Sequence, residues 1–291
     1  MEDIKLSKIE MNSLEVFQTN NANSEGIFYF YTTDDGTMLI KIIKDLYNRY
    51  TKIGLKNIKI LKEYNEILSA EFQEFVLPEA LVYIENELRG YIMHYINGIT
   101  LSSYLENPSI PLQKKLIILK KIGEILERMF NFKKIPYNIA LGDFHENNII
   151  ITNDGQIKII DLNGICLNPK DIPNCKYLNM AFDELHYNKP KYETDSILRE
   201  VTPNRDTDIF CYGMMIMNFI SQSEFGKLPY YKIKRYLDYL KTIGFSTEFI
   251  NCITKLYSSD KNENPYPYIE DITEEMMENA SMKVYSKIRP L

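Results

Sequence analysis

The sequence lacks the side chains and spacings on which small metal-binding or disulfide-linked proteins depend. It contains no tryptophan, three histidines and four cysteines (Cys166, Cys175, Cys211 and Cys252). The cysteines show no C-x-x-C pairing and have no histidine nearby at ligand spacing. This distribution argues against a zinc site and against a disulfide framework. We therefore expect reduced thiols and a cytoplasmic protein.

Long hydrophobic runs and an excess of positive charge are also lacking. The first residues alternate charged and apolar side chains, so no signal peptide is expected. The longest apolar stretch, residues 209–220, is interrupted by Asn218 and suits a buried core helix better than a membrane span. The net charge of −6 argues against a surface that coats nucleic acid. We expect no membrane span and no nucleic-acid partner.

The chain is long enough to bury a large core. Its 291 residues, 45 % of them hydrophobic and 25 % charged, suit one large domain or two lobes. The first part is rich in strand patterns, and a turn at residues 34–36 predicts a β-hairpin. Strands are predicted over residues 27–31, 38–43, 75–83 and 89–95. One helical pattern, with Ile60, Tyr64, Ile67 and Leu68 at spacings of three and four, lies between the two pairs of strands.

After about residue 96 the pattern becomes mainly helical. Helices are predicted over residues 112–130, 206–220, 230–242, 246–257 and 270–280. A short hairpin, residues 148–160, is predicted around the turn Asn153-Asp154-Gly155. The sequence thus predicts an α+β chain with two lobes. Residues 1–95 would form a small antiparallel β lobe with one helix, and residues 96–291 a larger, mainly helical lobe.

One loop carries a pattern suited to phosphoryl transfer. Residues 142–148 read G-D-F-H-E-N-N, and Asp161 follows the next predicted hairpin. The reaction needs a carboxylate to orient the attacking hydroxyl group and oxygen ligands for Mg²⁺. Asp143 would be the base, with Asn148 and Asp161 as metal ligands. Loops rich in Asp and Asn are often simple turns, but the strand, turn and strand that lead to Asp161 favour the catalytic interpretation.

These residues resemble the catalytic loop of the protein-kinase-like superfamily. The match is to the H-G-D-x-H-x-x-N form found in bacterial kinase-like proteins and aminoglycoside phosphotransferases, and it can be followed from about residue 21 to residue 265. The resemblance implies a bilobal protein-kinase-like fold that binds ATP with Mg²⁺ or Mn²⁺. It also implies a hydroxyl acceptor on a protein or on a small molecule.

In the first lobe, the resemblance implies that Lys41 anchors the α- and β-phosphates of ATP and pairs with a helix carboxylate. Glu63 is the first candidate for that partner, because Ile60, Ile67 and Ala70, at −3, +4 and +7 from it, predict that it lies on the inward face. Glu66 is the alternative. Taken alone, Lys41 would be interpreted as a solvated strand residue. Its position in an apolar strand that follows a predicted turn favours the phosphate-anchoring role instead.

The glycine-rich loop departs from the family pattern. Gly26 fits the third glycine of G-x-G-x-x-G, and Asn21 and Asn23 occupy the other two glycine positions. Asparagine tolerates a positive φ better than other non-glycine residues, so a similar turn can form that approaches phosphate less closely.

The segment after residue 92 resembles the family's hinge between the lobes. The resemblance implies that Met93 is the gatekeeper and that the backbones of His94 and Ile96 bind adenine.

In the second lobe, residues 208–213 resemble the D-x-W-S-x-G start of the central kinase helix, where a buried aspartate caps the catalytic loop. Asn204 and Asn264 occupy the positions of a glutamate–arginine ion pair, so both charges of that pair are expected to be missing. His145 lies two residues after the base and would either contact the γ-phosphate or orient the loop. No arginine precedes Asp143, so control by activation-loop phosphorylation is not expected.

Three functions remain open from the sequence. The first is a Ser/Thr-type protein kinase of the bacterial eukaryotic-like kind, favoured by the helix start at Asp208 and by Pro203. The second is a small-molecule kinase of the aminoglycoside or sugar type, favoured by the loop that contains His145. The third is a nucleotide-binding scaffold without catalysis, suggested by the missing glycines and opposed by the retained catalytic groups.

Overall fold

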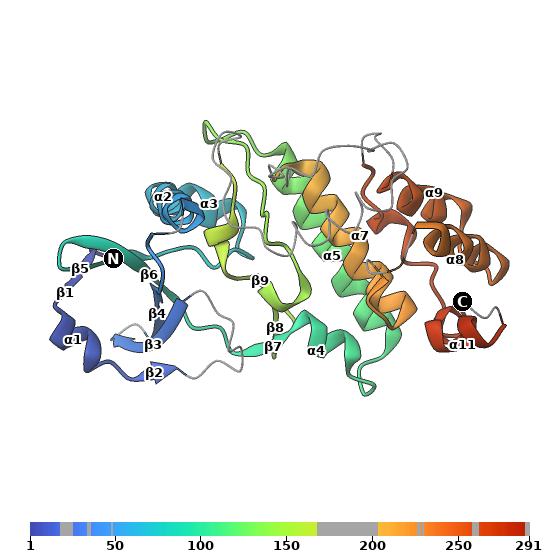
Figure 1. The fold of residues 1–291 in the computed structure, drawn as a ribbon, viewed down its shortest axis with the longest axis horizontal. Helices are drawn as coiled ribbons and strands as arrows, with labels where there is room; N and C mark the ends of the chain where they lie inside the picture. The colour runs from blue at the N-terminus through green and yellow to red at the C-terminus, as the bar shows by residue number, and fades with distance from the viewer. Residues whose placement is uncertain are drawn as a thin grey trace.

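The computed structural model describes residues 1–17, 26–33, 36–47, 49–167, 203–225, 228, 230–257 and 262–288. In this part of the chain the protein has an α+β fold. A six-stranded sheet lies at one end, helices α5 and α7 cross the middle, and helices α8 to α11 form the other end (Figure 1).

The first part of the chain supplies the sheet and three helices. Its elements are β1 (Ile4–Leu6), α1 (Lys8–Asn12), β2 (Val16–Phe17), β3 (Gly26–Thr33), β4 (Gly36–Ile43), α2 (Arg49–Glu63), α3 (Asn65–Glu71), β5 (Ala80–Ile84) and β6 (Glu87–His94). The strand order in the sheet is β1-β5-β6-β4-β3-β2. Neighbouring strands run antiparallel except β1, which pairs with β5 in parallel. The expected purely antiparallel sheet is therefore wrong at this edge, because a strand of three residues is too short to reveal its pairing in sequence.

The predicted hairpin of β3 and β4 is confirmed, and it decides where Lys41 points. Lys41 lies opposite Phe28 in the register of the hairpin. Ile40 and Ile42 belong to the core cluster on one face of the sheet, whereas Leu39 belongs to the larger core on the other face. Since side chains alternate between the two faces of a strand, Lys41 points with Leu39 toward the larger core.

The first part contains three helices where the sequence predicts one. Helix α1 is a single short helix with a capping box between Ser7 and Glu10 and no buried residue, so it shows no helical period. The periodic segment near residue 60 is divided into α2 and α3, because the backbone at Tyr64 (φ −103°, ψ 14°) leaves helical geometry. The two helices stay linked through Tyr64, whose N–H donates to the oxygen of Ile60 at 3.1 Å and whose oxygen accepts from the N–H of Leu68 at 2.9 Å.

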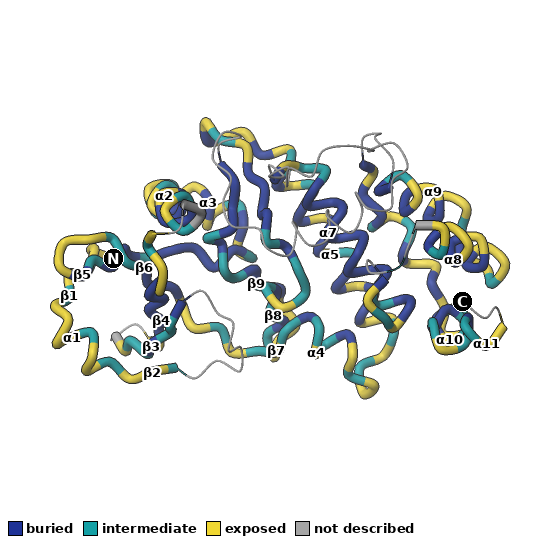
Figure 2. Tube along the Cα trace, in the orientation of Figure 1, coloured by how far each residue is buried: buried dark blue, intermediate teal, exposed yellow. Residues whose placement is uncertain are grey.

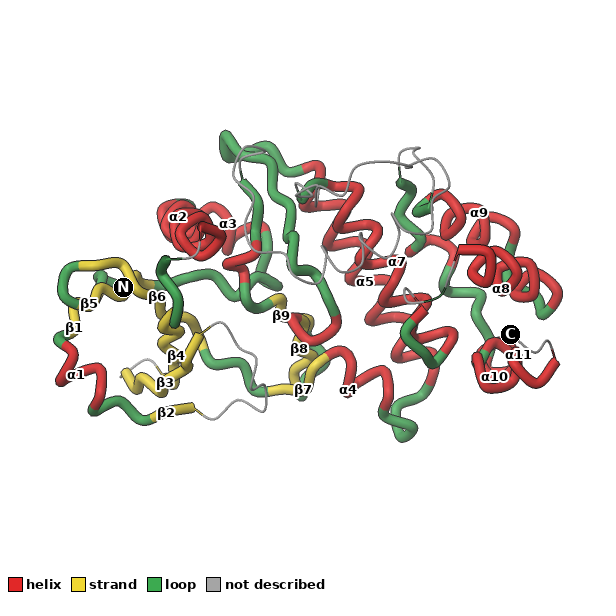
Figure 3. Tube along the Cα trace, in the orientation of Figure 1, coloured by secondary structure: helices red, strands yellow, loops and turns green. Residues whose placement is uncertain are grey.

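The second part is mainly helical and also contains a small sheet with the order β7-β8-β9 (Figure 3). Its elements are β7 (Gly98–Thr100), α4 (Leu101–Glu106), α5 (Leu112–Asn131), η1 (Glu146–Asn148), β8 (Ile149–Thr152), β9 (Ile157–Ile159), η2 (Leu162–Gly164), α7 (Arg205–Ser221), α8 (Tyr230–Thr242), α9 (Thr247–Lys255), η4 (Tyr266–Tyr268), α10 (Glu274–Ala280) and α11 (Met282–Ile288), where η marks a short 3-10 helix. The predicted hairpin and the helices α5, α7, α8 and α9 are confirmed. The last predicted helix begins four residues late, at Glu274, because Thr273 caps it by accepting a hydrogen bond from the N–H of Met276.

One hydrophobic core runs through both parts of the chain. It extends from Leu39 in the sheet through Ile122 in α5 to Tyr285 in α11. Helices α5 and α7 form its centre, where α7 is buried over most of its length and α5 contributes its apolar face (Figure 2). The predicted change near residue 95 therefore separates two kinds of secondary structure that share this core. Within the described ranges, no helix has both the length and the apolar character needed to cross a membrane.

Candidate active site

The β8–β9 hairpin brings Asn148 and Asp161 to the same end of one structural unit. Asn148 directly precedes β8 and Asp161 follows β9 by two residues. In the register of the hairpin Ile149 lies opposite Ile159, and the N–H of Ile160 donates to the backbone oxygen of Asn148 at 2.9 Å. Strand pairing thus holds Asn148 and Asp161 close together although they are thirteen positions apart in the sequence.

The loop that contains Asp143 is fixed from both sides. The Nδ2 amide group of Asn148 donates to the backbone oxygen of Asp143 at 2.9 Å. On the other side Gly164 approaches so closely that a Cβ atom added there would lie 2.8 Å from the Cβ of Asp143. A side chain at residue 164 would push the two segments apart. The partly exposed carboxylate of Asp143 is therefore carried by a loop with little freedom to move.

The oxygen atoms at this end of the hairpin suit a magnesium ion. Because the Nδ2 of Asn148 is used within the loop, its Oδ1 is the atom left for a ligand. The Asp161 side chain is 30 % exposed and provides a carboxylate. Oxygen donors of these two kinds are those that Mg²⁺ prefers. The pair therefore fits the metal-ligand role that the sequence predicts.

Lys41 joins this group from the sheet. Its side chain is only 1 % exposed and forms an ion pair with Asp161. Its Nζ also donates to Oδ1 of Asn163 at 2.9 Å and lies 5.5 Å from the ring centre of Phe28. A buried ammonium group is costly unless it is paired and hydrogen-bonded. The interpretation of Lys41 as a solvated strand residue is therefore wrong.

The backbone at Asp161 is held in an unusual conformation. Its φ of 58° and ψ of 49° lie in the left-handed region, which costs a non-glycine residue about 1–3 kcal/mol. Such strain persists where the surroundings over-determine the geometry and is typical of functional sites. Here it turns the chain from β9 into η2, so that Asp161 and Asn163 both meet Lys41.

The expectation that Glu63 lies on the inward face is wrong. Glu63 is the last residue of α2 and is exposed, as is the alternative, Glu66. Of the three residues expected to mark the inward face with Glu63, Ile67 and Ala70 are exposed and Ile60 is only partly buried. Among the contacts of the described residues, the ion pair of Lys41 is with Asp161.

The contacts of His145 favour the loop-orienting role over phosphate contact. Its Nδ1 accepts a hydrogen bond from the N–H of Asn147 at 3.2 Å and so caps η1. The other ring nitrogen, Nε2, lies 3.9 Å from Oδ2 of Asp143. Burial lowers the pKa of His145, an effect that the charges of Glu146 and Asp161 partly oppose. A neutral imidazole is a weaker partner for phosphate than a cation.

Asp208 caps the loop that contains Asp143, the arrangement that the resemblance implies. Its side chain is fully buried near the start of α7. Its two carboxylate oxygens accept hydrogen bonds from the N–H groups of Leu141 at 2.8 Å and Gly142 at 3.1 Å. Gly142 has a φ of 72°, a conformation that few other residues adopt. Burial raises the pKa of Asp208 to about 7, and the two hydrogen bonds only partly oppose this effect.

The raised pKa of Asp208 predicts a pH-dependent stability. The folded state binds this proton more tightly than the unfolded state, so the stabilisation is greatest at low pH and is lost as the pH rises through about 7. From pH 6 to 8 we expect the free energy of unfolding to fall by about 1 kcal/mol more in the wild type than in Asp208→Asn. Urea unfolding across this range measures the difference. Asp238→Asn, an exposed change on α8, should follow the wild type, and equal slopes in Asp208→Asn and wild type would contradict the shift.

The hinge segment has a backbone edge that points away from β4. The N–H of Tyr95 donates to the oxygen of Thr37 at 3.3 Å. Since hydrogen-bonded and non-hydrogen-bonded pairs alternate along antiparallel strands, the preceding residue, His94, directs its N–H and C=O to the opposite side. Met93 is buried and Ile96 is partly buried. The backbone of His94, to which the resemblance assigns adenine, is therefore directed away from β4.

The glycine-rich loop lies mostly outside the described residues, which exclude Asn21 and Asn23. Gly26 opens β3, and a Cβ added there would lie 3.0 Å from Cγ of Lys41 and 3.0 Å from the backbone oxygen of Ile42. A larger residue at position 26 would therefore displace the Lys41 side chain.

Asn204 and Asn264, which occupy the expected positions of a glutamate–arginine pair, each bond to a different helix. Asn204 caps α7, because its side-chain oxygen accepts hydrogen bonds from the N–H groups of Asp206 at 2.8 Å and Thr207 at 3.2 Å. Asn264 donates to the backbone oxygen of Gly123 at 3.1 Å. The two asparagines serve separate helices.

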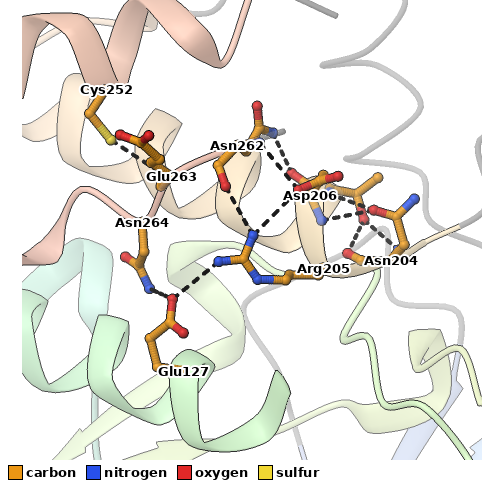
Figure 4. Close-up of polar contacts among 9 residues, drawn as sticks. Glu127, Asn204, Arg205, Asp206, Cys252, Asn262, Glu263 and Asn264 are labelled. Carbon is orange, nitrogen blue, oxygen red and sulfur yellow. Dashed lines mark hydrogen bonds and ion pairs between the residues drawn. The ribbon is translucent and has the colours of Figure 1, made fainter. Parts of the chain in front are cut away.

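An ion pair is nevertheless present in this region (Figure 4). The next residue along, Arg205, lies 3.4 Å from the carboxylate of Glu127 on α5 and donates to the backbone oxygen of Asn262 at 2.9 Å. Asn264 also donates to Glu127, at 3.3 Å. This link between α5 and α7 was not predicted, because Arg205 and Glu127 are 78 positions apart in the sequence and only helix packing brings them together.

The chain was compared with family models and with curated proteins, and neither comparison finds a match. The site therefore has to be interpreted from its own geometry. That geometry brings together Lys41, Asp143, Asn148 and Asp161, and it excludes Glu63 from the group.

Proposed function

We propose that this chain is an ATP-dependent phosphotransferase with the bilobal fold of the protein-kinase-like superfamily. The observation that carries the proposal is the meeting of three segments that are distant in sequence. Lys41 comes from β4, Asp161 from the end of the β8–β9 hairpin, and the loop of Asp143 is tied to that hairpin through Asn148. Residues 1–95 would form the nucleotide lobe and residues 96–291 the substrate lobe.

Each residue of the group has a role in the proposed reaction. Lys41 binds the phosphates of ATP, and the backbones of His94 and Ile96 bind adenine. Asn148 and Asp161 would hold Mg²⁺, which would supply positive charge next to the transferred phosphate. Asp143 orients the acceptor hydroxyl group and takes up its proton. A bond forms between the acceptor oxygen and the γ-phosphorus, the bond to the β,γ-bridging oxygen breaks, and ADP leaves.

A protein hydroxyl of the Ser/Thr type is the acceptor that we favour. The buried cap from Asp208 to the catalytic loop supports it, because this cap belongs to the part of the sequence that resembles protein kinases. A small-molecule acceptor is the second candidate. The loop with His145 supports it, because this loop resembles that of aminoglycoside phosphotransferases. In the structure His145 keeps its place in the loop by capping η1.

Label transfer from γ-labelled ATP tests the proposal. The purified chain would be incubated with labelled ATP and Mg²⁺ or Mn²⁺ in three parallel reactions. The first contains no added acceptor, the second a host lysate and the third an aminoglycoside panel. Transfer to protein supports the favoured acceptor, and transfer only to an aminoglycoside supports the second candidate. ATP binding without transfer to any acceptor, including water, would leave only the scaffold function.

A further inference from the structure

Lys41 receives both of its side-chain acceptors from one short segment of chain. Asp161 and Asn163 lie two residues apart across the start of η2, and both direct a side-chain oxygen to its Nζ. The amide of Asn163 adds an acceptor at 2.9 Å without adding a second negative charge. The ammonium group is thus held in place while, among the residues that the structure describes, one carboxylate is paired with it.

Helix α2 meets the same segment without a carboxylate. The only acidic residue of α2 is Glu63 at its exposed end. Two of the residues that face η2 are Gly54, where an added Cβ would lie 2.9 Å from the backbone oxygen of Asn163, and the fully buried Asn57. The Nδ2 of Asn57 donates to the backbone oxygen of Ile165 at 2.6 Å. The helix therefore holds the segment by close packing and by a neutral hydrogen bond.

We propose that Asn163 is a positioning residue for Lys41, in the place where a helix carboxylate was expected. Asn57 holds the segment of Asn163 against α2, so that the position of the helix is transmitted to Lys41 through η2. The consequence for nucleotide binding rests on the proposed function, whereas the positioning of the ammonium group does not. A lysine held by one carboxylate and one neutral acceptor keeps more of its charge for phosphate than one held by two carboxylates.

Chemical labelling of Lys41 tests the positioning without nucleotide. Acetic anhydride modification would be followed by peptide mass spectrometry, with exposed Lys59 as the internal reference. Asn163→Ala should raise the labelling rate of Lys41 roughly tenfold, the factor that corresponds to about 1.4 kcal/mol for a lost hydrogen bond to a charged group. Asn163→Asp, which keeps an acceptor oxygen, should restore protection. Asn153→Ala, in the exposed β8–β9 turn, should match the wild type.

Equal labelling of Lys41 in the wild type, Asn163→Ala and Asn163→Asp would overturn the proposal. If Asn163→Ala does not fold, Asn57→Leu is a second variant that tests the positioning of Lys41. It removes the hydrogen bond to Ile165 at similar volume, and it should raise Lys41 labelling in the same direction. An unchanged rate in this variant would overturn the role of α2.

Kinetics separate this proposal from the proposed function. If the wild type transfers phosphate, Asn163→Ala should raise the KM for ATP, with partial rescue by Asn163→Asp. An active wild type whose labelling and KM are unchanged in Asn163→Ala sinks the positioning role alone. An inactive wild type whose Lys41 becomes reactive in Asn163→Ala sinks the phosphotransferase function and keeps the positioning role.

Discussion

Asp143→Asn should lower phosphoryl transfer by about 10²–10⁴-fold, the usual contribution of a positioned acid–base group, with little change in ATP affinity. The substitution removes the proton acceptor but keeps the size of the side chain. The loop should stay in place, because Asn148 bonds to the backbone oxygen of residue 143 and Gly164 packs against its Cβ. Initial rates of label transfer, together with calorimetric ATP binding, measure the two effects separately.

The matched control for this variant is Asp271→Asn, an exposed change of the same chemistry, which should keep the wild-type rate. The thermal unfolding midpoint of Asp143→Asn should also stay near the wild-type value. Full activity in a folded Asp143→Asn would rule out residue 143 as the base. A loss of both ATP binding and stability would assign the residue to the architecture of the loop.

Lys41→Met should lower phosphoryl transfer by about 10²–10³-fold, a typical loss when one preorganised electrostatic partner is removed, and should weaken ATP binding. The methionine side chain is about as long as that of lysine and is uncharged, so it can occupy the buried position next to the Phe28 ring. The carboxylate of Asp161 then loses its ion pair and Asn163 loses its donor. Because the Asp161 side chain is 30 % exposed, water can solvate it, and we expect the protein to fold.

Lys59→Met is the control for this second prediction, since Lys59 is an exposed lysine of α2. It should leave the rate and the ATP affinity unchanged. A Lys41→Met variant with wild-type kinetics would mean that another cation binds the phosphates. The comparison with Asp143→Asn is informative, because only the lysine substitution should affect both ATP affinity and transfer.

Much of the fold could be predicted from short-range patterns. The β3–β4 hairpin and the helices α5 and α7 are long and strongly patterned, and the structure confirms them. The elements that were missed, such as β1 and α1, are three and five residues long. They are too short for a hydrophobic period, and pairing with β5 positions β1.

The residues of the candidate site that belong to one continuous motif could be predicted from the sequence. The contacts between that motif and distant segments could not. The spacing of Asp143, Asn148 and Asp161 follows from one hairpin, so the sequence was sufficient to bring them together. The partner of Lys41 was not predictable in this way. The choice of Glu63 depended on Ile67 and Ala70 marking a buried helix face, and in the tertiary structure no neighbouring element of the described part of the chain covers them.

The sequence by itself determined the candidate chemistry of this protein, because the residue types and their spacing along the chain are local properties. The tertiary structure alone decided which groups hold Lys41 and how α2 is connected to them. Those contacts depend on the close approach of Gly54 to Asn163 and on the hydrogen bond from Asn57 to Ile165. Both join residues more than one hundred positions apart in the sequence, and only the packing of α2 against η2 brings them together.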